Sequence, residues 1–241
     1  MIIIEELTKE YDKGIKALER MNLQLNEGTI SSFAGPNGAG KTTTLRILST
    51  LIRPTGGSVK ISGFDVSDEP EAVRAIVGYL PERVGFYERF SGAWNLFFYS
   101  SLFNKKINLN EHAELIDVLA LTEHLSQPVG KYSYGMKQKL GILRVLINQP
   151  EVLLLDEPMN ALDIEAQDAF KSILKIQKEM GKIVLISTHV LPTVENICDR
   201  LILINQGRII TDIPMSDVNS QIESRQKPFS INDFYLEKLR K

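Results

Sequence analysis

The sequence predicts an α/β protein in which a mostly parallel β-sheet combines with an antiparallel β layer and an inserted helical subdomain. Three features of the 241 residues lead to this prediction. The first third alternates short apolar runs with turn residues, residues 82–149 show helical periodicity, and continuous apolar runs return after residue 151. The predicted division is therefore residues 1–214, with 82–149 inserted, followed by a C-terminal tail at residues 215–241.

In the first third, apolar runs at residues 2–4, 23–25 and 59–61 are predicted to be strands of the antiparallel layer. Residues 29–34 are predicted to form another strand, which runs directly into a glycine-rich loop. Residues 41–50, after this loop, have the pattern of a helix. A strand, a glycine-rich loop and a helix in this order are typical of an anion-binding turn.

Residues 82–149 have a different character, with helices predicted at residues 91–103, 110–121 and 133–147. The third of these places apolar side chains on one face, namely Leu140, Leu143, Leu146 and Ile147. The helical subdomain is therefore expected to interrupt the α/β unit.

Two continuous apolar runs follow, at residues 152–155 and 183–187. Runs of this kind are expected of parallel strands that are covered on both faces. The helix between them is predicted at residues 165–180, with Gly181 as its C-cap.

The last part of the chain begins with a predicted hairpin at residues 200–213, which turns at Asn205-Gln206-Gly207. The tail is polar from Met215 until Phe229. Residues 230–239 are then predicted to form a short helix.

Bulk composition narrows the class of protein. A formal net charge of −2 argues against a nucleic-acid-binding protein, which usually carries a basic face. Cys198 is the only cysteine, so an intramolecular disulfide is excluded and a structural zinc site is not expected. The first residues are acidic where a signal peptide is basic, and no run of about 18 apolar residues occurs. We expect a cytoplasmic protein whose link to any membrane runs through a partner.

A glycine-rich segment matches the phosphate-loop pattern G-x-x-x-x-G-K-[ST]. Its residues are Gly35, Pro36, Asn37, Gly38, Ala39, Gly40, Lys41 and Thr42. The glycines let successive N–H groups point at an anion, and the following helix adds its positive N-terminal end. Lys41 can reach the β- and γ-phosphates, and the Thr42 hydroxyl can ligate Mg²⁺. The segment predicts a P-loop NTPase core that binds ATP with Mg²⁺.

The predicted strand at residues 152–155 ends in two carboxylates, Asp156 and Glu157. Asp156 is placed to hold Mg²⁺, directly or through a water molecule. Glu157 can act as a general base toward the water that attacks the γ-phosphate, or can orient that water. The alternative is a strand end with two solvated acids, and the phosphate loop in the same chain favours the catalytic interpretation.

The segment at residues 132–138, Tyr-Ser-Tyr-Gly-Met-Lys-Gln, resembles the signature motif of ABC ATPases. It lies about ninety residues after Lys41 and about twenty before Asp156. This order and spacing are similar to those of the ABC nucleotide-binding domain, and the resemblance covers nearly the whole chain.

The signature segment also has a physical interpretation as a helix N-terminus. Ser133 can cap the helix, and its hydroxyl can face an anion together with the Gly135 N–H. In the family this anion is the γ-phosphate held by the other subunit, and an ordinary capped helix is the alternative. The usual Leu-Ser-Gly-Gly-Gln is altered at Tyr132, Tyr134 and Met136, in a way that resembles the export-type subgroup.

The resemblance implies roles for further residues. Tyr11 occupies the place where the family stacks an aromatic ring on adenine, and Thr43 extends the nucleotide contacts of the phosphate loop. Residues 160–163 resemble the loop that crosses the dimer interface, which gives Asp163 a place beside the nucleotide. His189 matches the switch histidine, which contacts the γ-phosphate and takes part in catalysis with Lys41 and Glu157.

Glu82 is the clearest departure from the family pattern. It closes the segment at residues 78–82, expected to be a loop, where the family usually has a glutamine that touches Mg²⁺. A carboxylate can still ligate the metal, although it adds negative charge near the phosphates.

Aromatic side chains are concentrated in a short stretch: Phe86, Tyr87, Phe90, Trp94, Phe97, Phe98, Tyr99 and Phe103. Some of them are expected to form the core of the helical subdomain. The others are expected to form an exposed groove for a partner helix. In ABC transporters this region receives a short cytoplasmic helix of the membrane subunit, and we assign Phe86 and Tyr87 to that groove as a hypothesis.

The resemblance thus implies the ATP-hydrolysing subunit of an ABC transporter, of the exporting kind. Its expected partners are polytopic membrane permease subunits and a second ATPase subunit, in a homodimer or heterodimer, with no nucleic acid. It is expected to be peripheral on the cytoplasmic face of a membrane. The alternatives are a soluble ABC ATPase acting on DNA or ribosomes, a P-loop kinase for a small molecule, and a protein that binds ATP without turnover.

Overall fold

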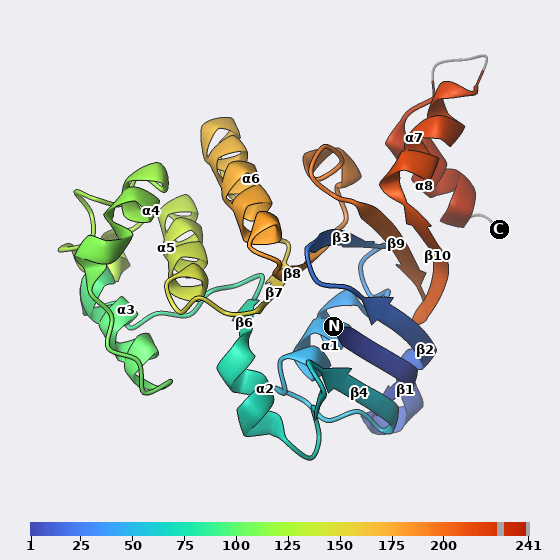
Figure 1. Ribbon diagram of the computed structural model, residues 1–241, viewed down its shortest axis with the longest axis horizontal. Helices are drawn as coiled ribbons and strands as arrows, with labels where there is room; N and C mark the ends of the chain where they lie inside the picture. The colour runs from blue at the N-terminus through green and yellow to red at the C-terminus, as the bar shows by residue number, and fades with distance from the viewer. Residues whose placement is uncertain (226–228, 240–241) are drawn as a thin grey trace.

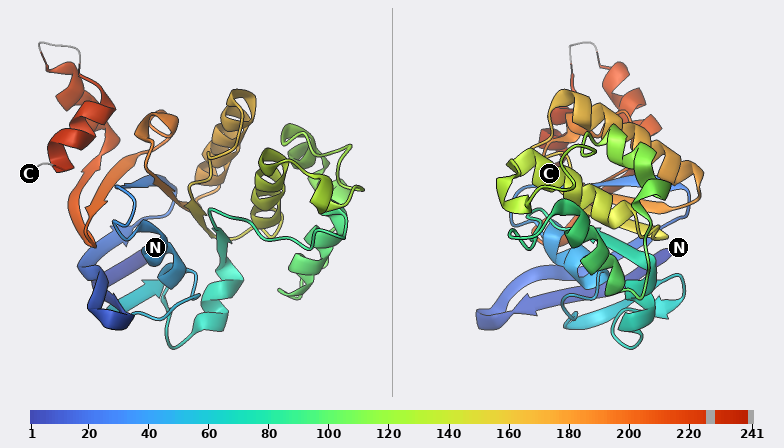
Figure 2. Two further views of the ribbon diagram at one scale, coloured as in Figure 1. Left: turned by 180° about the vertical axis from the view of Figure 1, so that it is seen from behind. Right: turned by 90° about the vertical axis from the view of Figure 1, so that its left-hand side faces the viewer.

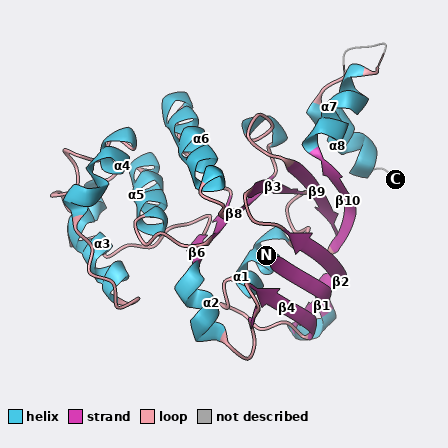
Figure 3. Cartoon of the chain, in the orientation of Figure 1, coloured by secondary structure: helices cyan, strands magenta, loops and turns pink. Residues whose placement is uncertain are grey.

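The computed structural model describes residues 1–225 and 229–239, and its elements are shown in Figures 1 and 3. The strands are β1 (Ile2–Tyr11), β2 (Ile15–Leu25), β3 (Thr29–Ala34), β4 (Gly56–Ile61), β5 (Phe64–Asp65), β6 (Val77–Leu80), β7 (Val152–Asp156), β8 (Ile183–Thr188), β9 (Arg200–Asn205) and β10 (Arg208–Pro214). The α-helices are α1 (Lys41–Leu48), α2 (Pro70–Ile76), α3 (Gly92–Ser101), α4 (Ala113–Val118), α5 (Tyr134–Leu146), α6 (Ile164–Glu179), α7 (Met215–Glu223) and α8 (Ile231–Leu239).

The strands form two sheets, as the sequence predicts. The larger has the order β10-β9-β3-β8-β7-β6, and its strands are parallel except for the edge strand β10. The smaller has the order β2-β1-β4-β5 and is antiparallel. The fold class, a mostly parallel sheet with an antiparallel layer and additional helices, is therefore confirmed.

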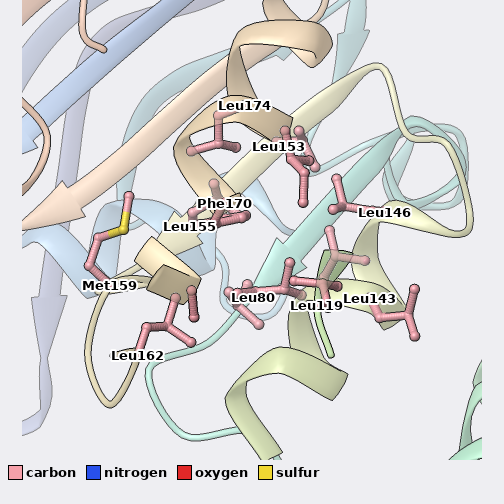
Figure 4. Close-up of a cluster of buried hydrophobic side chains, with 14 of the residues drawn as sticks. Leu80, Leu119, Leu143, Leu146, Leu153, Leu155, Met159, Leu162, Phe170 and Leu174 are labelled. Atoms are coloured by element: carbon pink, nitrogen blue, oxygen red, sulfur yellow. The ribbon is translucent and has the colours of Figure 1, made fainter. Parts of the chain in front are cut away.

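Alternate residues of the central strands face two separate hydrophobic clusters, because successive side chains of a strand point to opposite faces. Leu153 and Leu155 of β7 pack in a cluster that includes residues of α5 and α6, shown in Figure 4. Val152 and Leu154 face α1 and the antiparallel sheet. Burial of each such side chain stabilises the fold by about 1.5–3 kcal/mol. Both faces of the strand are covered, which explains its continuous apolar run.

Helices α3, α4 and α5 lie between β6 and β7 in the chain. They gather at the end of the molecule remote from the antiparallel sheet (Figures 1 and 2). The helix expected at residues 110–121 is shorter than predicted: a 3-10 turn, Leu109–His112, precedes α4. It ends early because Ala120 has a left-handed φ of 53°, which a right-handed helix cannot continue. The predicted domain boundaries stay a prediction.

The expectation of a loop at residues 78–82 is wrong for its first half, because Val77–Leu80 forms β6 at the edge of the parallel sheet. Gly78 weakens the strand pattern in the sequence. Its lack of a side chain has a packing reason, since a Cβ there would lie 2.7 Å from both Pro150 and Val145. Pairing with β7 therefore sets the conformation of this segment.

The polar tail from Met215 contains a helix, α7, that the sequence analysis did not predict. Met215 and Val218 are buried against Leu201 and Leu203 of β9, so a stripe of two or three apolar residues suffices to dock it. The predicted C-terminal helix is confirmed as α8. Residues 226–228 and 240–241 of the predicted tail lie outside the described residues.

Within residues 1–225 and 229–239, no helix combines the length and the apolar character needed to cross a membrane.

Candidate nucleotide-binding site

A cavity of about 320 Å³ opens at the phosphate loop, beyond the end of β3. It is lined by Ala17, Asn37, Gly38, Ala39, Gly40, Lys41, Thr42, Thr43, Glu82, Glu157, Asn160 and His189. Most of the predicted loop thus comes together with three other predicted residues, Glu82, Glu157 and His189, which are remote from it in the sequence.

The phosphate loop needs its glycines for two reasons. Gly38 and Gly40 have φ angles of 80° and 110°, in a region that residues with a side chain rarely adopt. Gly35 has an ordinary φ but no room, because a Cβ would lie 2.2 Å from the carbonyl oxygen of Ile204 in β9. The loop is therefore held tightly against the sheet, and it leads directly into the N-terminus of α1.

The Lys41 ammonium is folded back over this loop. Its Nζ donates hydrogen bonds to the carbonyl oxygens of Gly35, at 2.6 Å, and Pro36, at 3.2 Å. Burial lowers the pKa of Lys41, and the negative charges of Glu157, Asp156 and Glu82 oppose that effect. A cation surrounded by three carboxylates is suited to hold phosphate oxygens close to those carboxylates.

The two acids at the end of β7 share one hydrogen-bond partner. Because Asp156 pairs with Ser187 of β8 in register, the Ser187 hydroxyl can donate to Asp156 Oδ1, at 2.5 Å. The Glu157 backbone N–H donates to the same hydroxyl oxygen, at 3.1 Å. Asp156 Oδ2 is buried and has no hydrogen-bond partner among the described residues. An unpartnered buried carboxylate oxygen is costly, and a cation would satisfy it.

The orientation of the Glu157 side chain is set by its backbone conformation and by its contact with His189. Its φ of 50° is uncommon for a residue with a side chain, and such conformations cluster at functional sites. The side chain is 10% exposed, and its Oε1 lies 2.8 Å from Nδ1 of His189. The histidine itself is exposed at the cavity. A carboxylate and an imidazole in contact are suited to accept and hold a proton from water.

The predicted metal ligands do not form a cluster of acids and histidines. Across the described part of the chain, no group of three or more His, Cys, Asp or Glu side chains could hold a metal ion. Glu82 is exposed at the cavity, whereas Asp156 is buried beneath it. Thr42 lines the cavity with a partly buried side chain.

Tyr11 lies at the edge of this site. Its hydroxyl is 3.4 Å from Oγ1 of Thr43, and the side chain is exposed. The Lys9 ammonium lies 5.1 Å from the centre of the ring. The ring is thus next to the phosphate loop, where a base could stack on it.

Among the predicted nucleotide contacts, Ser133, Gly135 and Asp163 do not line the cavity of their own chain, nor do Tyr11, Gly35 and Pro36 at its edge. The exposed Ser133 caps α5, accepting a hydrogen bond from the Met136 N–H at 3.2 Å. Gly135 packs against the loop before α6, because a Cβ there would lie 2.7 Å from the carbonyl oxygen of Ala161.

Asp163 is the N-cap of α6. Its carboxylate accepts a hydrogen bond from the Ala166 N–H at 2.7 Å. That bond, with help from the charge of Lys139, lowers the pKa of Asp163. The carboxylate is therefore engaged in helix capping on a surface beside the signature helix.

The sequence analysis did not place Ser187, Ala17 or Asn160 in this site. Ser187 lies two residues before the predicted His189, so its position at the carboxyl end of a parallel strand was the available signal. Ala17 reaches the cavity from β2 and is an ordinary apolar residue, so nothing in the sequence marked it. Asn160 was assigned only to the dimer interface.

The sheet topology, the phosphate loop and the acidic end of β7 define a P-loop NTPase. The chain belongs to the ABC transporter family, whose sequence model matches residues 18–160. It is similar to the bacitracin transport ATP-binding protein BcrA of Bacillus licheniformis, at 34% identity over 95% of this chain and 79% of that protein. It is also similar to the doxorubicin resistance ATP-binding protein DrrA of Mycobacterium tuberculosis, at 36% identity over 88% of this chain and 65% of that protein.

Two solved structures extend the likeness. An ATP-binding subunit of an ABC transporter has a TM-score of 0.89 at 28% identity and covers 99% of both chains. The dimeric post-hydrolysis state of the cassette MJ0796, bound to ADP and Pi, has a TM-score of 0.81 at 26% identity and covers 89% of this chain and 99% of that one. The chain is thus an ABC ATPase and the ATP-binding subunit of an ABC transporter, and the kinase, non-transport and non-hydrolysing alternatives are less well supported.

Proposed function

We propose that this ATPase powers export as one half of a head-to-tail dimer attached to polytopic permease subunits on the cytoplasmic face of a membrane. The observation that supports the dimer is that the signature residues lie apart from the nucleotide cavity of the same chain. Ser133 is exposed and Gly135 is partly exposed, and neither lines the cavity of its own chain. A second copy, or a related ATPase subunit, would bring its signature helix to the nucleotide held by the first.

The proposed cycle follows from this division of the site. ATP would contact the Lys41 loop of one subunit and the Ser133 helix of the other, so it would favour the closed dimer. Hydrolysis removes the γ-phosphate that both subunits contact, and the dimer would then reopen. Opening and closing would move the attached permease subunits.

Mg²⁺ fits the residues at the acidic strand end. The unpartnered Oδ2 of Asp156 and the hydroxyl of Thr42 are oxygen ligands of the kind that Mg²⁺ prefers. Glu82, at the cavity, is a further candidate ligand in place of the family's glutamine. When bound, the ion supplies positive charge that offsets the phosphate charge.

The chain's own groups have distinct roles in the proposed hydrolysis. Lys41 holds phosphate oxygens, which would compete with the carbonyl oxygens of Gly35 and Pro36 for its ammonium. Glu157 accepts a proton from the attacking water, and His189 orients that carboxylate through their 2.8 Å contact. Tyr11 would support the adenine ring at the edge of the site.

Export is supported by the altered signature segment and by relatives named for bacitracin transport and for doxorubicin resistance. The substrate of this transporter would be selected by its permease subunits, since the chain binds the nucleotide.

The aromatic stretch offers a docking surface for a permease helix. Tyr87, Phe90, Trp94 and Phe97 of this stretch are between 36% and 48% exposed, although aromatic side chains are usually buried. Phe90 and Trp94 are stacked, with ring centres 4.0 Å apart. Phe86 instead packs against the core of the helices, with the Arg144 guanidinium 5.3 Å from its ring centre.

A second cavity, of about 700 Å³, continues this surface. It lies between α2 and the helices α3 and α5, and its apolar wall includes Leu51, Leu102 and Phe103. Leu51 and Leu102 are both 61% exposed. We propose that a short cytoplasmic helix of the permease covers these side chains, as a helix-in-groove contact does.

Because Phe86 packs against the helical core, the test uses the exposed pair: replacing both Tyr87 and Phe90 by serine is expected to lower the amount of permease that co-purifies with the ATPase by roughly tenfold or more. The measurement is the permease-to-ATPase ratio after affinity purification from membranes. Phe64→Ser, at the exposed Phe64 of the antiparallel sheet, is the matched control and is expected to keep the wild-type ratio. Normal permease recovery by a correctly folded double variant would count against this docking surface.

The proposed function as a whole is tested by recovering the tagged protein from gently solubilised membranes of its own host and identifying its partners by mass spectrometry. A polytopic membrane protein in stoichiometric amount is the expected result. A purely soluble partner, ribosomes or DNA would contradict the transport role and leave the ATPase activity standing.

A further inference from the structure

Tyr79 lies on the strand next to the proposed metal carboxylate. β6 and β7 are parallel, and Tyr79 pairs with Leu154. Paired residues of neighbouring strands point to the same face, and so do residues two apart on one strand. Tyr79, Leu154 and Asp156 therefore share the face toward α1, where Tyr79 and Leu154 also join one hydrophobic cluster.

The surroundings of the Tyr79 hydroxyl are unusual for an edge strand. Burial raises its pKa to about 12, and the negative charge of Asp156 adds to that effect. The Arg46 guanidinium, from α1, acts on the hydroxyl in the opposite direction. A tyrosine hydroxyl is an O–H donor, and the shared face of β6 and β7 directs it toward the Asp156 carboxylate.

One carboxylate oxygen of Asp156 is available to accept a hydrogen bond from the Tyr79 hydroxyl. Its Oδ1 accepts the hydrogen bond from Ser187, whereas Oδ2 has no partner of normal geometry among the described residues. A hydrogen bond from the Tyr79 hydroxyl would use one lone pair of Asp156 Oδ2 and leave the other for a cation. Such a bond would fix the plane of the carboxylate from the side opposite Ser187.

We propose that Tyr79 is a positioning residue that orients the Asp156 carboxylate for its divalent cation. This inference rests on the proposed metal-binding role of Asp156. Groups that hydrogen-bond a metal ligand hold its geometry, and their loss typically lowers metal affinity by about 10–100-fold. Tyr79 also lines the second cavity.

The test is Tyr79→Phe in the full chain, compared with Tyr99→Phe. Tyr99 lines the same cavity, but its hydroxyl donates to the carbonyl oxygen of Gly85, at 3.0 Å. The readout is the affinity for a non-hydrolysable ATP analogue, measured by titration calorimetry with Mg²⁺ and again with a chelator. The ratio of the two affinities reports the contribution of the metal.

Tyr79→Phe is expected to reduce this ratio by about 10-fold or more, chiefly through the Mg²⁺ titration. Tyr99→Phe is expected to leave the ratio unchanged. If Tyr79→Phe lost affinity equally with and without Mg²⁺, the ratio would be unchanged. That result would show a merely structural role for Tyr79 and would overturn the proposal, even if the melting temperature of the variant had changed.

The wild-type titration separates this proposal from the one on which it rests. If Mg²⁺ gave the wild-type chain no gain in affinity, or if Asp156→Asn kept the gain, the metal site itself would be wrong. If Mg²⁺ raised the affinity of the wild-type chain and of Tyr79→Phe equally, but not that of Asp156→Asn, the metal site would stand. Only the role of Tyr79 would then be refuted.

Discussion

Replacing Glu157 by glutamine is expected to lower ATP turnover by at least about 100-fold, because an amide cannot accept a proton from water. Binding of ATP should remain, since glutamine has nearly the same shape and the backbone N–H of residue 157 keeps its bond to Ser187. The loss should appear in kcat, with little change in the apparent affinity for ATP. Steady-state phosphate release at several ATP concentrations measures both quantities.

The same variant is expected to accumulate as an Mg-ATP dimer, because the closed state would form and would not be emptied by hydrolysis. Size-exclusion chromatography with and without Mg-ATP follows the dimer. Glu151→Gln is the control: Glu151 is exposed and precedes β7 at the end opposite Glu157, so turnover and association should match the wild type. An inactive Glu157→Gln chain that binds ATP, yet stays monomeric at saturating ATP even with the permease present, would argue against the head-to-tail dimer.

The sequence predicted best those parts of the site whose chemistry is contiguous. The loop from Gly35 to Thr42 needs glycines, a lysine and a hydroxyl at fixed spacing, and each constraint is local. Asp156 and Glu157 directly follow the apolar run of one strand, so the pattern of that strand was enough to predict where they lie. The cavity brings most of these residues together as expected.

What the sequence could not show depends on contacts between remote segments. β6 is a strand because β7 lies beside it, and a four-residue run containing Gly78 carries too little pattern to predict it. α7 depends on the surface of β9 in the same way. Strand register pairs Ser187 with Asp156 and puts Tyr79, which pairs with Leu154, on the same face as Asp156. Register has no signature in a single sequence.

The signature helix illustrates a different limit. Ser133 was predicted correctly as the cap of α5, and local chemistry suffices for that. Its proposed partner is the nucleotide of another subunit, so that contact lies between two chains and leaves no pattern within one. Of the altered residues, Tyr132 has a local role in the fold, because its hydroxyl donates to the carbonyl oxygen of His124 at 2.6 Å. Tyr134 is exposed.

Replacing Lys41 by methionine is expected to weaken ATP binding by at least about 30-fold, since removing one partner of a buried charge pair costs about 2–5 kcal/mol. The ammonium is balanced by the nearby charges of Glu157, Asp156 and Glu82. Without it, the phosphates of ATP would meet these carboxylates with no cation from the loop. Titration with a fluorescent ATP analogue measures the loss, and Lys171→Met, at an exposed ion pair on α6, is the control.

This explanation also predicts how Lys41 and Glu157 are coupled. If repulsion from the carboxylates causes much of the loss, then Glu157→Gln should weaken ATP binding little by itself but restore part of it in a Lys41→Met background. The two substitutions would then deviate from additivity, as expected for groups that act on each other at close range. Strict additivity in the double-mutant cycle would mean that Lys41 acts on the phosphates alone. A loss of about 2 kcal/mol corresponds to roughly 30-fold weaker binding. If Lys41→Met bound ATP within about threefold of the wild type, the proposed role of Lys41 would therefore be contradicted.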